Sequence, residues 1–221
     1  KSAKCDLLPF SVQSKVDGAY LDRASDDKKT IKLSNLADSL IVISEIGIKG
    51  IHNVYNSMAA ALAAYSMGIS ADAIRTALKS FKGVEHRLEF VREVNGVEFI
   101  NDSKATNVDS VWYAISAIEK PIILLLGGRD KGNDYTKLFQ IVKNKVKAII
   151  AIGESAEKIY TEFRPFTEVK KVASMQEAVS EASEISTAGE VVLLSPACAS
   201  FDWFKNYEHR GKVFKELVAQ L

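Results

Sequence analysis

The second half of the chain alternates apolar runs with amphipathic patterns. Residues 122–126 are continuously apolar, which indicates a strand buried on both faces, as in a parallel sheet. Asn95-Gly96 lies between two strand-like runs and predicts a hairpin with a type I′ turn over residues 90–100. This alternation predicts a doubly wound, Rossmann-like α/β domain with right-handed crossovers. Further strands are predicted at 148–152, 169–172 and 191–194, and helices at 108–118, 135–142, 156–163, 174–185 and 204–221.

The first 83 residues carry a weaker pattern. Short strands are predicted at 7–12, 18–21, 30–33 and 40–43, the second and third pairing around a polar turn at 25–29. An alanine-rich helix is predicted at 53–67, and a second helix follows Ser70 and ends before Gly83, the expected C′ residue. These elements include no phosphate loop. We therefore expect residues 1–83 to be the tail of a larger α/β domain, joined to residues 84–221 by a hinge at 82–88.

Composition narrows the possible partners. The formal charge is +1 over 221 residues, so the chain has no general attraction to nucleic acid or to a membrane surface. No apolar run approaches the length of a membrane span. Cys5 and Cys198 do not make a disulfide framework, and we expect a reducing, cytoplasmic compartment. The three histidines, His52, His86 and His209, show no metal-ligand spacing.

Three polar loops follow predicted strands in the second domain, at residues 101–107, 127–134 and 195–202. If these strands are parallel, all three loops leave the sheet at the same edge, where ligands bind in α/β folds. The loop at 127–134 is rich in glycine but lacks the ending of a Walker A motif. The sequence therefore predicts a ligand site at this edge that is not a phosphate loop.

The loops carry side chains suited to an anionic ligand. Asp102 could accept a hydrogen bond from a ribose hydroxyl, and Lys104 could meet a phosphate or a carboxylate. Thr106 and Ser200 could donate to an anion, the latter helped by N–H groups at the start of the last helix. Lys131 is a point charge for a small anion. The alternative is that Asp102 is a turn or cap residue and that Lys104 and Lys131 are solvated side chains.

Two further features have competing interpretations. Asn53 and Asn56 share one face at the start of the alanine-rich helix, where one serves as the N-cap. The other could hold a nucleotide or a metal-bound water, or it could be an ordinary exposed asparagine. A nucleophilic role for Cys198 is disfavoured, because nothing in the sequence supplies the base that it needs.

Six segments of the chain form a set: 50–56 (GIHNVYN), 86–87 (HR), 101–107 (NDSKATN), 127–131 (GGRDK), 195–202 (SPACASFD) and 204–211 (FKNYEHRG). Taken together, these segments resemble the Mur ligases, and in particular the branch that adds D-glutamate. The resemblance implies an ATP-dependent peptide ligase of bacterial cell-wall synthesis, in which ATP with Mg²⁺ phosphorylates the carboxylate of UDP-N-acetylmuramoyl-L-alanine. The amino group of D-glutamate then attacks the acyl phosphate. Such chemistry needs positioning and charge stabilisation more than a protein nucleophile.

The resemblance implies that residues 1–83 are the C-terminal part of a central ATP-binding domain. Carried over residue by residue, Asn53 and Asn56 resemble contacts on the nucleotide and metal side, and Asp102 resembles the ribose contact. Two residues resemble the catalytic cations: Arg87 reaches the ATP phosphates, and Lys104 lies near the reacting phosphate.

The resemblance implies that residues 84–221 form the amino-acid-binding domain. Thr106 and Lys131 resemble the partners of the α-carboxylate of the amino acid. Ser200, the backbone of Phe201 and the neighbourhood of Tyr207 resemble the pocket for its side-chain carboxylate. Arg129-Asp130 adds charge beside Lys131, which leaves the preferred amino acid open.

The chain also departs from the family pattern. The phosphate loop, the modified metal-bridging lysine and the UDP-binding domain have no counterpart here, and we expect them upstream of Lys1. We therefore expect these 221 residues alone not to catalyse ligation, and we expect a monomer. The alternatives are a related ligase that adds a different amino acid, and a non-catalytic module that binds a nucleotide or an amino acid.

Overall fold

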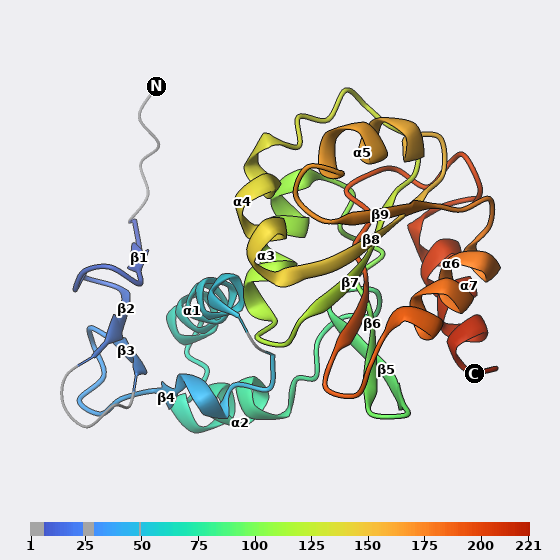
Figure 1. Cartoon of the computed structure of the whole chain (residues 1–221). Coiled ribbons are helices and arrows are strands. Elements are labelled where there is room, and N and C mark those ends of the chain that lie inside the picture. The colour runs from blue at the N-terminus through green and yellow to red at the C-terminus, as the bar shows by residue number, and fades with distance from the viewer. Residues whose placement is uncertain (1–6, 24–28, 49) are drawn as a thin grey trace. The chain divides into compact units, whose positions relative to one another are not determined.

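Two separate sheets organise the chain, each with its own helices (Figure 1). The computed structural model describes residues 7–23, 29–48 and 50–221. The chain divides into two units, Lys1–Gly83 and Val84–Leu221. No helix among the described residues is both long enough and apolar enough to cross a membrane.

The first unit is a small four-stranded sheet with two helices. Its strands follow one another in the order β1 (Phe10–Ser11), β2 (Ala19–Asp22), β3 (Thr30–Leu33) and β4 (Ile41–Val42). β1 pairs with β2 in parallel, and the other two pairs are antiparallel. The predicted pairing of 18–21 with 30–33 is confirmed, whereas the predicted strand at 7–12 is reduced to β1. The predicted turn at 25–29 lies mostly outside the described residues.

Alternation along β2 explains the core of this unit. Ala19 and Leu21 are buried, whereas the residues between and after them are half-buried, because successive strand residues face opposite sides. A short 3₁₀ turn (Ile43–Glu45) follows β4 and precedes α1 (Ile51–Ser66) and α2 (Ala71–Ser80). Met58 in α1 and Ile74 in α2 pack in the same apolar cluster as residues of β2 and β3.

The helix boundaries correct two predictions. α1 begins at Ile51 with Gly50 as its N-cap, so Asn53 lies inside the helix and is not a cap. α2 does begin after Ser70, whose side chain accepts from Ala73 N–H, but it ends at Ser80. Gly83 therefore lies beyond the C′ position, although it has the left-handed backbone expected there.

The second unit is a six-stranded sheet in the order β5-β6-β10-β7-β8-β9. β5 is an antiparallel edge strand, and the other five strands are parallel. Asn95 and Gly96 both have positive φ angles, in agreement with the type I′ turn predicted between β5 and β6. The strands are β5 (Glu89–Val94), β6 (Val97–Asn101), β7 (Ile122–Gly127), β8 (Val146–Ile152), β9 (Glu168–Lys171) and β10 (Val191–Leu194).

Helices cover both faces of this sheet, which confirms the doubly wound prediction. All six residues of β7 are buried; Leu124 faces one apolar cluster and Leu125 the other. Full burial of one such side chain stabilises the fold by roughly 1.5–3 kcal/mol. The first cluster holds α3 (Val108–Ala117), α4 (Thr136–Lys145) and α5 (Ala156–Phe163), and the second holds α6 (Met175–Ile185) and α7 (Tyr207–Val218).

The last helix differs from its prediction. α7 begins at Tyr207, and Asn206 is its N-cap, accepting from His209 N–H over 2.7 Å. Phe204 therefore precedes the helix. Ser200 lies in the loop that precedes this helix start.

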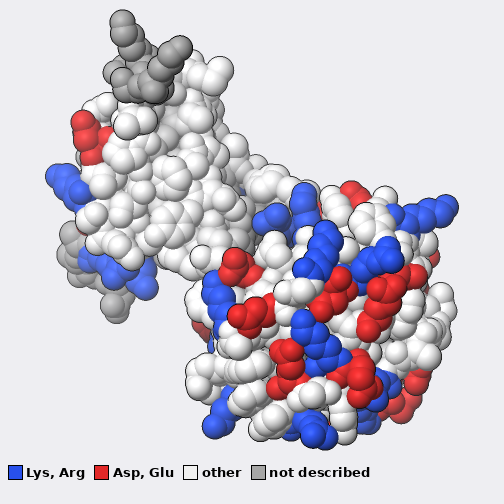
Figure 2. All heavy atoms as spheres, turned by 90° about the horizontal axis from the view of Figure 1, so that it is seen from above, with Lys and Arg blue, Asp and Glu red and all other residues white. Residues whose placement is uncertain are grey.

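Charged side chains of both signs are interspersed over the face of the second unit seen in Figure 2. The visible face carries no large patch of one sign, in keeping with the formal charge of +1.

Candidate functional site

The candidate site is formed by three loops at one edge of the second sheet. β10 pairs in parallel with β6 on one side and with β7 on the other, so their carboxyl ends are adjacent. We name the segments that follow them the β6 loop (residues 102–107), the β7 loop (residues 128–135) and the β10 loop (residues 195–206). Ligands of open α/β sheets bind beyond these strand ends, so this edge is where a ligand is expected.

Hydrogen bonds join the β10 loop to both of its neighbours. Ser195 Oγ donates to Asp102 Oδ2 in the β6 loop over 2.8 Å. Arg129 N–H in the β7 loop donates to Ala199 O over 2.9 Å. The three loops therefore form one connected framework.

Arg210 in α7 connects the β6 loop to the β10 loop. Its side chain is buried, with only 1% of the residue exposed. The guanidinium donates to Ser103 Oγ (3.0 Å) and Ser103 O (2.9 Å) in the β6 loop. It also donates to Cys198 O (3.1 Å) and Ala199 O (3.4 Å) in the β10 loop. Burial lowers the pKa of Arg210 to about 10, so the side chain stays charged at neutral pH.

Asp102 is the buried carboxyl group of the site. It is 4% exposed, and its Oδ1 accepts from Leu88 N–H over 3.2 Å. Burial raises the pKa of Asp102 to about 7, against the opposing effects of the Ser195 and Leu88 hydrogen bonds and of the Arg87 charge. Each carboxylate oxygen has two lone pairs, so each can still accept one bond from a ligand.

The β7 loop approaches the β10 loop so closely that only glycine fits at its start. Gly128 has a φ of 137°, and a Cβ there would lie 2.4 Å from Ala199 O. Gly132 in the same loop also has a positive φ (80°), but a Cβ there would meet nothing within 4 Å. Substitution at Gly132 therefore measures the cost of backbone strain alone, whereas substitution at Gly128 adds the cost of a steric clash.

We expect Gly128→Ala to lower the free energy of unfolding by ~3 kcal/mol, because strain and a backbone clash add together. Gly132→Ala is the matched control and should cost only ~1 kcal/mol from backbone strain. Urea unfolding of both variants, followed by tryptophan fluorescence, measures the difference. Equal losses in the two variants would contradict the close approach of the loops.

The structure brings Lys104 and Tyr207 together. The Lys104 ammonium lies 5.7 Å from the centroid of the Tyr207 ring, and Tyr207 is the first residue of α7. Ser103 Oγ donates to Tyr207 O over 2.8 Å, which fixes the start of α7 against the β6 loop. Arg87 is exposed, just before β5.

Three predicted ligands of the amino acid have polar groups that the chain itself leaves unused. Within the described residues, the hydroxyls of Thr106 and Ser200 make no hydrogen bond, and the Lys131 ammonium makes no ion pair. Ser200 is nevertheless only 2% exposed, Thr106 is half-buried and Lys131 is exposed. Phe201, beside Ser200, is 60% exposed. Each of the three donors comes from a different loop.

A family model described as "Mur ligase, glutamate ligase domain" matches residues 86–198, which include the β6 and β7 loops and the start of the β10 loop. The chain belongs to the Mur ligase family. Its relatives include the UDP-N-acetylmuramoylalanine--D-glutamate ligase of Chloroherpeton thalassium, which is 54% identical over 97% of this chain and 47% of the relative. The enzyme of the same name from a Thermoanaerobacter species is 46% identical over 99% of this chain and 49% of the relative. The chain spans about half the length of these curated relatives.

Solved Mur ligases share the fold. The UDP-N-acetylmuramate-alanine ligase of Thermotoga maritima aligns with a TM-score of 0.69 at 18% identity, over 96% of this chain and 47% of the other. A MurF ligase from Thermotoga maritima in complex with ADP aligns with a TM-score of 0.62 at 14% identity, over 96% of this chain and 49% of the other.

The asparagine pair of this Mur ligase chain lies in the first unit. Asn56 Nδ2 donates to Asn53 Oδ1 over 3.2 Å, and Asn53 is buried whereas Asn56 is exposed. The N-cap of α1 is Gly50 and not either asparagine. Amide oxygens suit a hard cation or its bound water, so the pair is chemically compatible with Mg²⁺.

A cluster near the start of the second unit resembles a metal site, but its carboxylates already have partners within the chain. Glu85, His86 and Glu89 place their ligand atoms within 4.8 Å of one another. Lys215 Nζ pairs with Glu85 Oε1 (2.7 Å) and Glu89 Oε1 (2.8 Å), and Asn101 Nδ2 donates to Glu89 Oε2 (2.9 Å). The cluster is therefore better described as an internal polar network that anchors α7 to the segment before β5.

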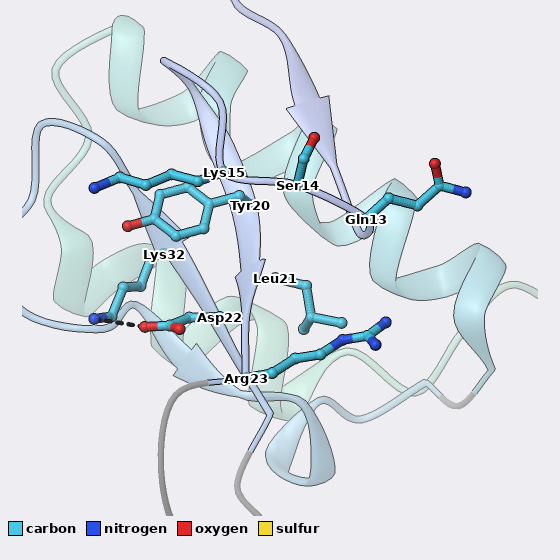
Figure 3. A pocket seen from close by; sticks show the side chains of 8 residues that line it. All are labelled: Gln13, Ser14, Lys15, Tyr20, Leu21, Asp22, Arg23 and Lys32. Carbon is cyan, nitrogen blue, oxygen red and sulfur yellow. Dashed lines mark ion pairs between the residues drawn. The ribbon is translucent and has the colours of Figure 1, made fainter.

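The first unit also contains a shallow hollow, shown in Figure 3, which none of the predicted site residues lines. Lys32 Nζ pairs with Asp22 over 2.7 Å, and the Lys15 ammonium lies 5.8 Å from the Tyr20 ring centroid. Lys32 and Lys15, which line the hollow, thus already have partners within the first unit.

Sequence reasoning missed the residues that support the loops. Arg210 carried a detectable signal, because it shares the buried stripe of α7 with Phe214 and Val218, where a charge needs an explanation. Asn133 and Lys158 carried no such signal, because their partners lie in separate segments of the chain.

Cys198 supports the framework as a buried thiol. Tyr135 OH and Asn133 Nδ2 each lie 3.3 Å from its Sγ. Burial raises the pKa of Cys198, which opposes formation of a thiolate. This environment agrees with the prediction that Cys198 is not a nucleophile. The other cysteine, Cys5, lies outside the described residues.

Proposed function

We propose that this chain forms the D-glutamate pocket and part of the nucleotide site of a cytoplasmic, monomeric ligase of peptidoglycan synthesis. That enzyme joins D-glutamate to UDP-N-acetylmuramoyl-L-alanine at the expense of ATP. The observation that carries the proposal is the set of three unused donors, Thr106, Lys131 and Ser200, on three interconnected loops. The names of the relatives support D-glutamate as the amino acid.

A dicarboxylic amino acid matches these donors. Lys131 and Thr106 bind the α-carboxylate, the first through charge and the second through its hydroxyl. Ser200 and the backbone N–H of Phe201 bind the side-chain carboxylate beside Tyr207. The low exposure of Ser200 strengthens its hydrogen bond to an anion, because little water competes there.

The remaining polar residues suit the nucleotide. When bound, ATP with Mg²⁺ supplies the phosphoryl group that activates the acceptor carboxylate. From the first unit, Asn53 and Asn56 would hold the metal-bound water. From the second unit, Asp102 would accept from the ribose through its remaining lone pairs, and Arg87 and Lys104 would stabilise negative charge on the phosphate.

We expect Lys131→Ala to weaken D-glutamate binding by roughly tenfold or more, because it removes a charge-assisted contact. Lys143→Ala, at an exposed lysine in α4, is the matched control and should change the affinity by less than about twofold. Calorimetric titration with D-glutamate, L-glutamate, D-lysine and ATP measures both variants. Tighter binding of D-lysine would reassign the amino acid. Failure of the unaltered chain to bind any of the three, or equal effects of Lys131→Ala on ATP and on D-glutamate, would overturn the proposal.

A further inference from the structure

A lysine outside the site described above holds the β7 loop in place. Lys158 lies in α5, and its Nζ donates to Asp130 Oδ2 over 2.9 Å and to Asn133 O over 2.6 Å. The same ammonium lies 5.3 Å from the centroid of the Tyr135 ring. All three contacts are with one loop, so Lys158 joins that loop to a helix packed on the sheet.

Asp130 closes the loop around Lys131. Its Oδ1 accepts from Asn133 N–H over 2.9 Å, so residues 130–133 form a turn with Lys131 between two anchored positions. Burial alone would raise the pKa of Asp130, but the bonds from Asn133 N–H, Lys158 and Gly132 N–H lower it overall. The carboxylate is therefore charged and bound on both oxygens at neutral pH.

Asn133 extends the connection to the β10 loop. Its Nδ2 donates to Ala197 O over 3.2 Å and lies 3.3 Å from Cys198 Sγ. Ser200 follows two residues after Cys198 in the same loop. A continuous path of contacts thus runs from Lys158 through Asp130 and Asn133 to the loop that carries Ser200.

An isolated surface ion pair would contribute little to stability or to a site. The pair between Glu157 in α5 and Lys171 at the exposed end of β9 is of that kind. Its atoms lie 2.6 Å apart, and neither residue belongs to the three loops. Lys158 differs because it has two acceptors in one turn, and because Asp130 is also bonded to that turn. Lys171 therefore provides a control lysine with an ion pair of the same type.

We propose that Lys158 is a positioning residue, which acts through Asp130 to hold Lys131 at the place required to bind a carboxylate of the amino acid together with the β10 loop. This rests on the proposed function, because it assumes that Lys131 binds the ligand. Lys158 itself donates into the turn and not to the ligand.

Two substitutions that change the charge in opposite directions test the proposal. Lys158→Met removes a positive charge and Asp130→Asn removes a negative one, yet both break the same contact. We expect each to weaken D-glutamate binding about tenfold, or ~1.4 kcal/mol, whereas a purely electrostatic effect would make the second variant bind more tightly. Lys158→Arg should restore most of the affinity, and Lys171→Met should leave it unchanged.

A double-mutant cycle then asks whether Lys158 acts through Lys131. In a Lys131→Ala background, Lys158→Met should have little further effect on D-glutamate binding. An undiminished further loss would overturn the positioning role, as would tighter binding by Asp130→Asn.

Hydrogen exchange of residues 129–134 in the ligand-free chain tests the contact independently of the amino acid. We expect faster exchange in Lys158→Met and Asp130→Asn but not in Lys171→Met. Unchanged exchange would overturn the inference even if D-glutamate binds. If the unaltered chain does not bind D-glutamate, the proposed function is overturned, and with it the positioning role of Lys158. Faster exchange in the two variants would in that case still establish the contact of Lys158 with the β7 loop.

Discussion

Arg210→Met is expected to lower the free energy of unfolding of the second unit by ~4 kcal/mol. Methionine preserves much of the apolar stem but removes all the donors of the guanidinium. Ser103 O and Cys198 O would then be left buried without the bonds that Arg210 now gives them. Each buried acceptor that loses its partner costs roughly 1–3 kcal/mol. Loss of these bonds would also weaken the connection between the β6 loop and the β10 loop, leaving the Ser195–Asp102 bond between them.

Urea unfolding followed by tryptophan fluorescence measures this effect in the second unit alone, because both tryptophans of the chain, Trp112 and Trp203, lie there. Lys212→Met is the matched control, since Lys212 is an exposed residue of the same helix. Arg210→Lys should give an intermediate loss, because one ammonium cannot reach all the acceptors. A loss below about 1 kcal/mol for Arg210→Met would show that the loops do not depend on it.

The second unit is expected to lose stability as the pH rises from about 4 to 7, in part because of Asp102. The ordinary pKa of an aspartate is 3.8, and burial raises that of Asp102 to about 7 in the folded state. Between these values the folded state keeps a proton that the unfolded state has released. The free energy of unfolding therefore falls with pH over this window, and the loss is complete above about pH 7.

Asp102→Asn isolates this contribution. The amide can accept from Leu88 N–H and donate to Ser195 Oγ, so it retains both internal bonds without titrating. Between about pH 4.5 and 8, the unaltered chain should lose ~3 kcal/mol more than the variant. Urea unfolding across this range provides the comparison. Parallel pH profiles for the two proteins would contradict the raised pKa of Asp102.

The parts of the fold that were predictable are those set by local pattern. The apolar run at 122–126 identified β7, Asn95-Gly96 identified the hairpin turn, and α5 and β10 were predicted with their observed bounds. These elements follow from periodicity and turn chemistry, which are properties of neighbouring residues. The position of the three polar loops at one edge of the sheet was predictable because parallel strands end on the same side.

The predictions failed at two helix starts and wherever contacts between distant segments decide the outcome. One asparagine of the Asn53–Asn56 pair was predicted to be the N-cap of its helix, but the N-cap of α1 is Gly50. The last helix was predicted from Phe204 because apolar spacing continues there, whereas the Asn206 cap starts it at Tyr207. The bonds of Arg210 and Lys158 join residues of separate elements, and no periodicity reveals such partners.

The order of the strands has a consequence for biosynthesis. β10 is the last strand to be translated, yet it lies between β6 and β7 in the finished sheet. Until residues 191–194 leave the ribosome, the nascent chain cannot complete the centre of this sheet, and the facing edges of β6 and β7 remain without a partner. Unpaired apolar edges promote aggregation. We therefore expect deletions that remove β10 to yield insoluble protein and not a smaller soluble domain.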